Sequence, residues 1–146
     1  MNRMDGKVCA VTGGTQRPGA GIARRLAAAG AAGVVVTGRN AERGRAVADS
    51  LSCPALFVPA DLAEVKDCRR IIAEADRRFG RVDVLVNAAA ITDRGTIFDT
   101  SPDLFFDAMF ATNVRAPFFL MQEAIRLMIR DGLRATLSSR RGLRLG

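Results

Sequence analysis

The glycine-rich segment TGGTQRPGAG, residues 12–21, has the residue types and spacing that best suit the binding of a phosphate group. It lies between the apolar run KVCAV at residues 7–11 and the Ala- and Leu-rich segment 22–30. In a strand–turn–helix unit of this kind, the free N–H groups and the dipole of the helix N-terminus attract a pyrophosphate. Gly13 permits the sharp turn, and Gly19 lets the helix begin close to the strand. The segment predicts a nucleotide-binding loop, with an ordinary structural turn as the alternative.

Several residue types that acid–base or metal chemistry uses are missing. The sequence has no His, Tyr or Trp, and its lysines are Lys7 and Lys66. A mechanism that needs a histidine base or a tyrosine acid therefore cannot run on this chain alone. Cys9, Cys53 and Cys68 are scattered, without the paired spacing of a metal site or a disulfide-rich pattern, and we interpret them as reduced core thiols. We predict no metal site.

Alternating strands and helices surround the loop. Short apolar runs that stop at turn residues predict strands over 7–13, 33–38, 55–62 and 82–87. Start and stop signals around periodic or Ala-rich segments predict helices over 19–30, 40–51, 63–80, 101–111 and 113–132. The strands are apolar throughout, as expected when both faces of a sheet are covered. The sequence therefore predicts an α/β fold with a parallel sheet between two layers of helices.

Three further motifs follow the TGGTQRPG loop in order along the chain. They are DL at residues 61–62, VNAAA at 86–90 and TNV at 112–114. With these motifs the chain closely resembles the N-terminal, cofactor-binding half of the short-chain dehydrogenase/reductase family. The resemblance implies a Rossmann-type doubly wound parallel sheet with strand order 3-2-1-4, and a nicotinamide dinucleotide bound at the carboxyl ends of the strands.

The resemblance also implies the site residues. Asn113 corresponds to the helix asparagine that holds a water of the family's proton relay. The implied cofactor-binding residues are Gly13, Thr15, Gln16, Arg17, Gly19, Arg39, Asp61, Leu62, Asn87 and Ala89.

The loop departs from the family pattern T-G-x-x-x-G-x-G at two positions. Thr12, Gly13 and Gly19 match it, but Arg17 replaces the middle glycine and Pro18 the usual Ile or Leu. If that position needs a positive φ, a residue other than glycine costs about 1–2 kcal/mol. The Arg17 side chain either blocks the pyrophosphate or reaches round and pairs with it. Of the two, we expect weakened binding.

Three of the implied site residues have plainer interpretations. Asp61 falls where the family lines the adenine pocket, but Asp is also a common turn residue at a strand end. Asn113 is equally suited to cap its helix. The family's N-N-A-G motif matches at Asn87 and Ala89 and not at the other two positions. The plainer interpretation of Asn87 is that it only forms hydrogen bonds with loop backbone groups.

The end of the second strand favours NADP(H) over NAD(H). NAD-specific sites place an acid there to bind the ribose 2′-hydroxyl, whereas an Arg accommodates a 2′-phosphate. This chain has Gly38 and Arg39 there, so no carboxylate repels the phosphate and a guanidinium fork matches its geometry. The alternative is that Arg39 is a solvated loop residue.

The resemblance covers residues 6 to about 132, and we predict a dinucleotide-binding domain over 1–132. Residues 133–146 are basic and without a clear period, and we interpret them as a disordered or non-family tail, with a weak fifth strand around ATL (135–137) as the alternative. The family continues with a catalytic Ser and a Tyr-x-x-x-Lys motif. We do not expect Ser139 to be that serine, because the preceding strand would be too short. The chain is interpreted as truncated or altered in reading frame.

These features predict an oxidoreductase that transfers a hydride between a nicotinamide and a carbonyl or alcohol substrate, incomplete and inactive as given. The alternative is a non-catalytic dinucleotide-binding or interaction module.

The net charge of +7 suits nucleic acid, but four of these charges are arginines after Leu133 and no zinc-finger or RNA-binding signature is present. Nucleic-acid binding is therefore not favoured. Without a bilayer-length apolar run or a signal-peptide core, a cytoplasmic protein without membrane contact is expected.

Self-association is also predicted. Four strands in the order 3-2-1-4 would leave the apolar fourth strand as an open edge. The helix over 113–132 carries an apolar stripe at helical spacing. Without further strands its large apolar side chains cannot all be buried, and such a patch is typical of an interface. The stripe residues are Val114, Phe118, Met121, Ile125 and Met128, with Phe119 beside them.

Overall fold

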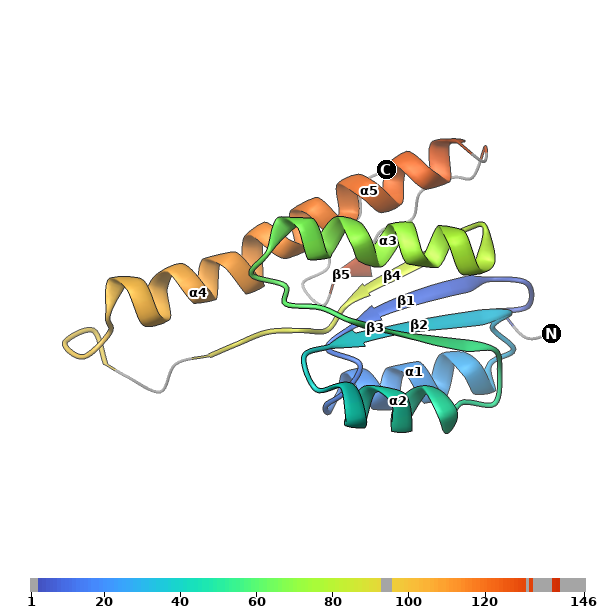
Figure 1. The fold of residues 1–146 in the computed structure, drawn as a ribbon, viewed down its shortest axis with the longest axis horizontal. Coiled ribbons are helices and arrows are strands. Elements are labelled where there is room, and N and C mark those ends of the chain that lie inside the picture. The colour runs from blue at the N-terminus through green and yellow to red at the C-terminus, as the bar shows by residue number, and fades with distance from the viewer. Residues whose placement is uncertain (1–2, 93–95, 131, 133–137, 140–146) are drawn as a thin grey trace.

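Five parallel strands form the sheet of the computed structural model, which describes residues 3–92, 96–130, 132 and 138–139 (Figure 1). The order is β3-β2-β1-β4-β5, which confirms the predicted 3-2-1-4 arrangement. The fifth strand pairs with the end of β4, Ser138 with Val86 and Ser139 with Asn87, so that end of β4 is not an open edge. The segment 135–137, where this strand was expected, lies outside the described residues. The strands are β1 (Val8–Thr12), β2 (Gly33–Gly38), β3 (Ala55–Pro59), β4 (Val84–Asn87) and β5 (Ser138–Ser139).

Helices cover both faces of the sheet, as the unbroken apolar strands predicted. On one face lie α1 (Gly19–Ala28) and α2 (Ala41–Asp49), and on the other α3 (Val65–Phe79) and α5 (Ala116–Arg130) (Figure 1). Each face of the sheet packs against its helices in a separate hydrophobic core. Successive residues of a strand contribute to one core and then the other, because their side chains point to opposite faces. Cys9 therefore packs with α1, whereas Ala10 packs with α3 and α5.

Local signals set the ends of two helices as predicted. Asn40 caps α2, with its Oδ1 accepting from the Arg43 N–H at 2.9 Å. Gly80 follows α3 with a φ of 74°, which glycine adopts without the strain of a Cβ. The third strand ends at Pro59 rather than at residue 62, so Asp61 and Leu62 lie in the loop that leads to α3.

At the amino ends of the strands, the carboxylate of Asp83 joins β1 to the start of β4. It accepts from the Val8 N–H at 2.8 Å and from two nitrogens of Arg81 at 2.8 and 2.6 Å. Burial raises the pKa of Asp83, but the hydrogen bonds from Arg81 and Val8 and the nearby positive charges outweigh it, and the pKa lies below its ordinary value.

All three cysteines are free thiols, and Cys9 and Cys68 are buried in opposite cores. Burial, followed by the charges of Asp83 and Cys53, raises the pKa of Cys9 to about 12. This thiol is therefore protonated at neutral pH and acts as a small apolar side chain.

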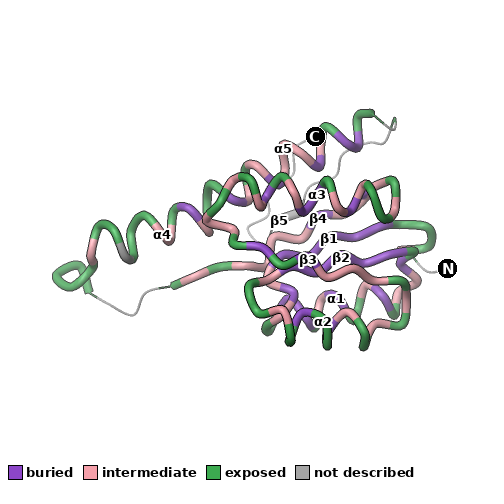
Figure 2. Tube along the Cα trace, in the orientation of Figure 1, coloured by how far each residue is buried: buried purple, intermediate pink, exposed green. Residues whose placement is uncertain are grey.

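The segment after residue 101 is one helical run rather than two helices. The π-helical turn η1 (Pro102–Phe106), α4 (Asp107–Phe110), the π-helical turn η2 (Ala111–Arg115) and α5 follow one another directly. The first three elements of this run, η1, α4 and η2 (residues 102–115), extend beyond the sheet as an arm, and most of the arm is exposed (Figure 2). None of the helices in the described ranges is long and apolar enough to cross a membrane.

The buried face of α5 is distinct from the apolar stripe that was expected to be partly exposed. Small or slender residues face α3 and the sheet, namely Ala116, Leu120, Ala124, Leu127 and Met128. Of the predicted stripe only Met128 is fully buried, and Val114 and Phe118 are each 56% exposed. This exposure agrees with the prediction that the large apolar side chains of the stripe cannot all be buried. The face of α5 that packs on α3 and the sheet was not itself predicted.

Candidate functional site

A cleft of about 460 Å³ lies at the carboxyl edge of the sheet, where β1, β2, β3 and β4 end. Of the ten predicted cofactor-binding residues, all except Gly19 and Asn87 line it. The lining residues are Gly13, Thr15, Gln16, Arg17, Pro18, Arg39, Ala60, Asp61, Leu62, Ala63, Ala88, Ala89, Ala90, Ile91, Ala108 and Thr112. The fold thus brings segments that are far apart in the sequence to one place.

Two glycines of the β1–α1 loop have no room for a side chain. Gly13 has a φ of 65°, and a Cβ there would lie 2.8 Å from the Cα of Ala89. A Cβ on Gly19 would lie 2.2 Å from the carbonyl oxygen of Gly13. The loop therefore packs against itself and against the end of β4, and α1 begins directly behind it. Thr12, which is 1% exposed, adds to this contact because its Oγ1 accepts from the Ala89 N–H at 3.3 Å.

Arg17 replaces a family glycine without adopting a glycine conformation. No residue other than glycine has a positive φ in the described part of the chain, so the condition for a backbone penalty at position 17 is not met. Arg17 and Arg39 are exposed, both line the cleft, and neither forms a hydrogen bond or ion pair with a residue that the structure describes. The cleft therefore carries two unpaired positive charges, and Asp61 is the one acid among its lining residues.

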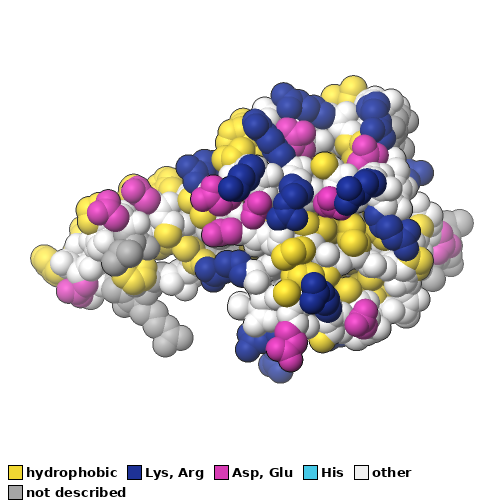
Figure 3. All heavy atoms as spheres, in the orientation of Figure 1, with side chains coloured by type: hydrophobic (Ala, Val, Ile, Leu, Met, Phe, Trp, Pro, Cys, Tyr) yellow, Lys and Arg dark blue, Asp and Glu magenta, His cyan; other side chains and the backbone are white. Residues whose placement is uncertain are grey.

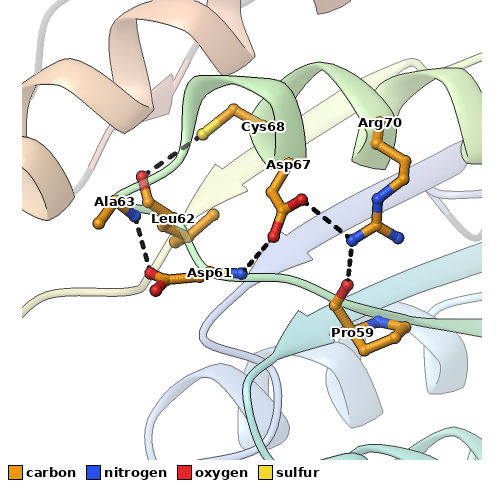
Figure 4. A network of polar contacts seen from close by, with 7 residues as sticks. All are labelled: Pro59, Asp61, Leu62, Ala63, Asp67, Cys68 and Arg70. Atoms are coloured by element: carbon orange, nitrogen blue, oxygen red, sulfur yellow. Dashed lines mark hydrogen bonds and ion pairs between the residues drawn. The ribbon is translucent and has the colours of Figure 1, made fainter.

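A network of polar contacts holds the loop that carries Asp61 (Figure 4). Asp61 Oδ1 accepts from the Ala63 N–H at 2.9 Å, and the Asp61 N–H donates to Asp67 Oδ2 at 2.8 Å. Asp67 also pairs with Arg70, which donates to the carbonyl of Pro59. The hydrogen bond from the Asp61 N–H is the main cause that lowers the pKa of Asp67, with Arg70 contributing. Asp61 is thus a turn residue and a cleft residue at once, so the two interpretations coexist.

Asn113 does not cap a helix, because it lies inside η2 in a continuous helical run. Its Oδ1 accepts from the Ile91 N–H at 2.9 Å and its Nδ2 donates to the Ile91 carbonyl at 2.8 Å. Asn113 therefore fixes the chain that follows β4 to the arm, and Ile91 lines the cleft. π-Helical turns are frequent at functional sites.

Asn87 lies at the end of β4, with Thr12 on one side and Ser139 on the other. Its Oδ1 is buried and has no hydrogen-bond partner among the described residues, so that oxygen does not satisfy a loop backbone group there. A buried acceptor of this kind costs free energy unless another group satisfies it.

Some lining residues escaped sequence reasoning. Ala108 and Thr112 come from the arm, and Ala60, Ala63 and Ile91 have side chains without a chemical signal. Ala60 and Ala63 lie beside Asp61 and Leu62 in the loop after β3, whereas Ile91, Ala108 and Thr112 are brought to the cleft by the path of the chain after β4, which the sequence did not indicate. Within the described ranges, no group of three or more His, Cys, Asp or Glu side chains is placed to hold a metal ion.

Comparison with known proteins identifies relatives of this arrangement. The family model described as short chain dehydrogenase matches residues 7–144, a range that extends beyond the domain boundary predicted at residue 132. Versicolorin reductase 1 of Aspergillus parasiticus is 35% identical over 141 residues, which are 94% of this chain and 53% of the relative. Sorbitol dehydrogenase of Cereibacter sphaeroides is 33% identical over 89% of this chain and 50% of its own length. The chain thus spans about half the length of these curated relatives.

Solved structures agree with the sequence relatives. A metagenomic short-chain oxidoreductase in complex with NADP superposes with a TM-score of 0.84 and 31% identity, over 93% of this chain and 62% of that one. A blue fluorescent protein from a metagenomic library, in complex with NADPH, gives a TM-score of 0.83 and 32% identity over 95% and 56% of the two chains. With the matched family model, the parallel sheet and the glycine-rich loop in agreement, the chain belongs to the short-chain dehydrogenase family.

Proposed function

We propose that the chain binds NADP(H), in preference to NAD(H), in the cleft at the carboxyl edge of the sheet. The observation that carries the proposal is the pair of unpaired guanidinium groups, Arg17 and Arg39, in a cleft with one acid. Arginine matches phosphate geometry with a planar fork of donors, and an acid at the end of the second strand would repel a 2′-phosphate.

The residues of the cleft fit a dinucleotide. Gly13 and Gly19 leave the loop backbone and the α1 N-terminus free to approach a pyrophosphate, because no side chain stands between them. Asp61 and Leu62 line the cleft, and in this proposal they contact the adenine. Asn87 carries a buried oxygen that has no donor among the described residues. The solved relatives bound to NADP and NADPH support the same ligand class for this chain.

In this proposal each residue has a limited task. The backbone of the β1–α1 loop binds the pyrophosphate, Arg39 and Arg17 balance the phosphate charge, and Asn113 holds the Ile91 main chain beside the cleft. The bound nicotinamide supplies a hydride that can be exchanged with a carbonyl or alcohol carbon. The oxidoreductase activity of the whole protein is part of the proposal.

The test is a titration of the chain with NADPH and NADH, repeated for Arg39→Asp. We expect the ratio of the two dissociation constants to move towards NADH by about tenfold or more, the size of losing one charge-assisted contact and gaining another. Arg24→Asp is the matched control, since Arg24 is exposed on α1 and does not line the cleft. An unchanged ratio in Arg39→Asp, or the same change in both variants, would contradict the assignment of Arg39.

A non-catalytic dinucleotide-binding module is the second candidate function. It applies to the 146 residues as given, which contain no Tyr, because the family's proton donor is a tyrosine. We expect the purified chain to bind NADPH without reducing any member of a panel of aldehydes and ketones. Turnover above that of a heat-denatured sample, surviving repurification, would contradict this expectation.

We also propose that the chain self-associates through the arm. Phe106, Phe110, Val114 and Phe118 recur every four residues and are each more than half exposed, and Phe106 stacks on Phe110 at 4.7 Å. The last three of these residues line a groove of about 750 Å³, and acidic side chains lie beside the apolar ones on the arm (Figure 3). An apolar stripe of this extent is typical of a protein interface.

A further inference from the structure

Gly38, the last residue of β2, lies directly against the side chain of Thr15 in the β1–α1 loop. A Cβ at position 38 would lie 2.5 Å from Thr15 Cγ2, 2.6 Å from Oγ1 and 3.1 Å from Cβ. These distances are far below van der Waals contact. Gly38 does not have a positive φ, so its backbone conformation suits any residue. A side chain at position 38 is therefore disfavoured by the overlap with Thr15 and not by backbone strain.

Rotation of Thr15 does not remove the overlap. The Thr15 Cβ has three staggered positions, and the two that face Gly38 hold Cγ2 and Oγ1. Threonine has only one hydrogen for these three positions, so every rotamer leaves at least one heavy atom facing Gly38. Serine has two hydrogens and can turn its hydroxyl away, and alanine has no γ atom. The branched side chain of Thr15 is therefore the obstacle.

The end of β2 is where a dinucleotide site places an acid to accept from a ribose 2′-hydroxyl. We propose that Thr15 constrains cofactor specificity at position 38, because its branched side chain excludes an acidic side chain there. The chain cannot gain the acid that recognises NAD(H) at this position without a change at Thr15. This inference rests on the proposed cofactor-binding function. It assigns Thr15 a steric role. This role is separate from the charge of Arg39, which follows Gly38 in the sequence and is exposed.

The steric part is tested without any ligand, by thermal melting of Gly38→Ala in the parent and in Thr15→Ser and Thr15→Ala. We expect Gly38→Ala to lower Tm in the parent, and to lower it much less when position 15 is Ser or Ala. Gly21→Ala is the matched control, because a Cβ on Gly21 meets no atom within 4 Å, and it should not lower Tm. An equal effect of Gly38→Ala in all three backgrounds overturns the inference.

The cofactor part is tested by titrating Gly38→Asp and Thr15→Ser/Gly38→Asp with NADH and NADPH. We expect Gly38→Asp alone to weaken the binding of both, and the double variant to shift the ratio of dissociation constants towards NADH by roughly tenfold. If Gly38→Asp alone gains NADH affinity as fully as the double variant, Thr15 is not the obstacle. If the unmodified chain binds neither dinucleotide, the proposed function and the cofactor part fail together, and the melting experiment still decides the steric contact.

Discussion

Replacing Asp67 by Ala tests whether the polar contacts around Asp61 hold its loop in place beside the cleft. The change removes the acceptor of the Asp61 N–H, at 2.8 Å, and the ion pair with Arg70, at 3.4 Å. It leaves the hydrogen bond between Asp61 and Ala63 intact, because that bond lies within the loop. The variant therefore separates the anchoring of the loop to α3 from the turn itself.

The size of the effect follows from the exposure of these groups. A hydrogen bond to a charged group contributes about 1.5–3 kcal/mol when it is well buried. The Asp67 side chain is 20% exposed and water can reach the freed N–H, so the lower end of that range applies. An ion pair at the surface adds about 0–1 kcal/mol. We expect Asp67→Ala to lower the free energy of unfolding by about 1–2 kcal/mol.

The measurement is urea unfolding followed by circular dichroism, with titration of NADPH on the folded variants. Asp67→Asn keeps an acceptor for the Asp61 N–H and should lose less stability than Asp67→Ala. Glu74→Ala is the matched control on α3, because Glu74 forms only an exposed ion pair with Arg77 three residues on, worth about 0.5 kcal/mol or less. A loss in Asp67→Ala no larger than in Glu74→Ala would refute the anchoring role of Asp67.

Three further predictions concern charge and the exposed arm. A carboxyl whose pKa is lowered in the fold stabilises the protein above its ordinary pKa of about 4. It loses this contribution as the pH falls through the folded-state pKa. Because the pKa of Asp83 is lowered, Asp83→Asn should flatten the fall of Tm below about pH 4. Arg17 has no positive-φ strain and no partner among the described residues, so Arg17→Gly should weaken NADPH binding a few-fold, most at low salt. This reverses the expectation from the sequence, and a tighter complex would mean that the Arg17 side chain obstructs the pyrophosphate as first expected. Phe110→Ser should lower the average mass in light scattering, whereas the same change at Ile129, which is exposed but outside the groove, should not.

The sheet and its two helical layers were predictable because each strand is a short apolar run bounded by turn residues. Strands that are covered on both faces lack an alternation of polar and apolar residues, and the sequence alone shows that these strands lack it. Eight of the ten predicted cofactor residues line the cleft for a related reason, since the carboxyl ends of parallel strands meet at one edge. Their roles in binding stay predictions.

The course of the chain after β4 was not predictable from local pattern. Asn113 looked like a helix start, and only the position of Ile91 in space shows what its amide contacts. The buried face of α5 was missed because Ala116 and Ala124 owe their burial to the close approach of α3, which is a property of the pair of helices. The contact between Thr15 and Gly38 likewise joins the loop after β1 to the end of β2, and neither segment alone indicates it.

The three glycine positions of the family loop pattern, two of which are glycine in this chain, meet different requirements. Gly13 needs a positive φ and has no room for a Cβ, and Gly19 would collide with the loop itself. At the middle position the backbone takes a φ that any residue adopts, and the side chain of Arg17 is exposed. The backbone at Arg17 therefore carries no positive-φ strain. What the loss of that glycine changes is the charge and the bulk at the mouth of the cleft, and these two effects act in opposite directions on a bound phosphate.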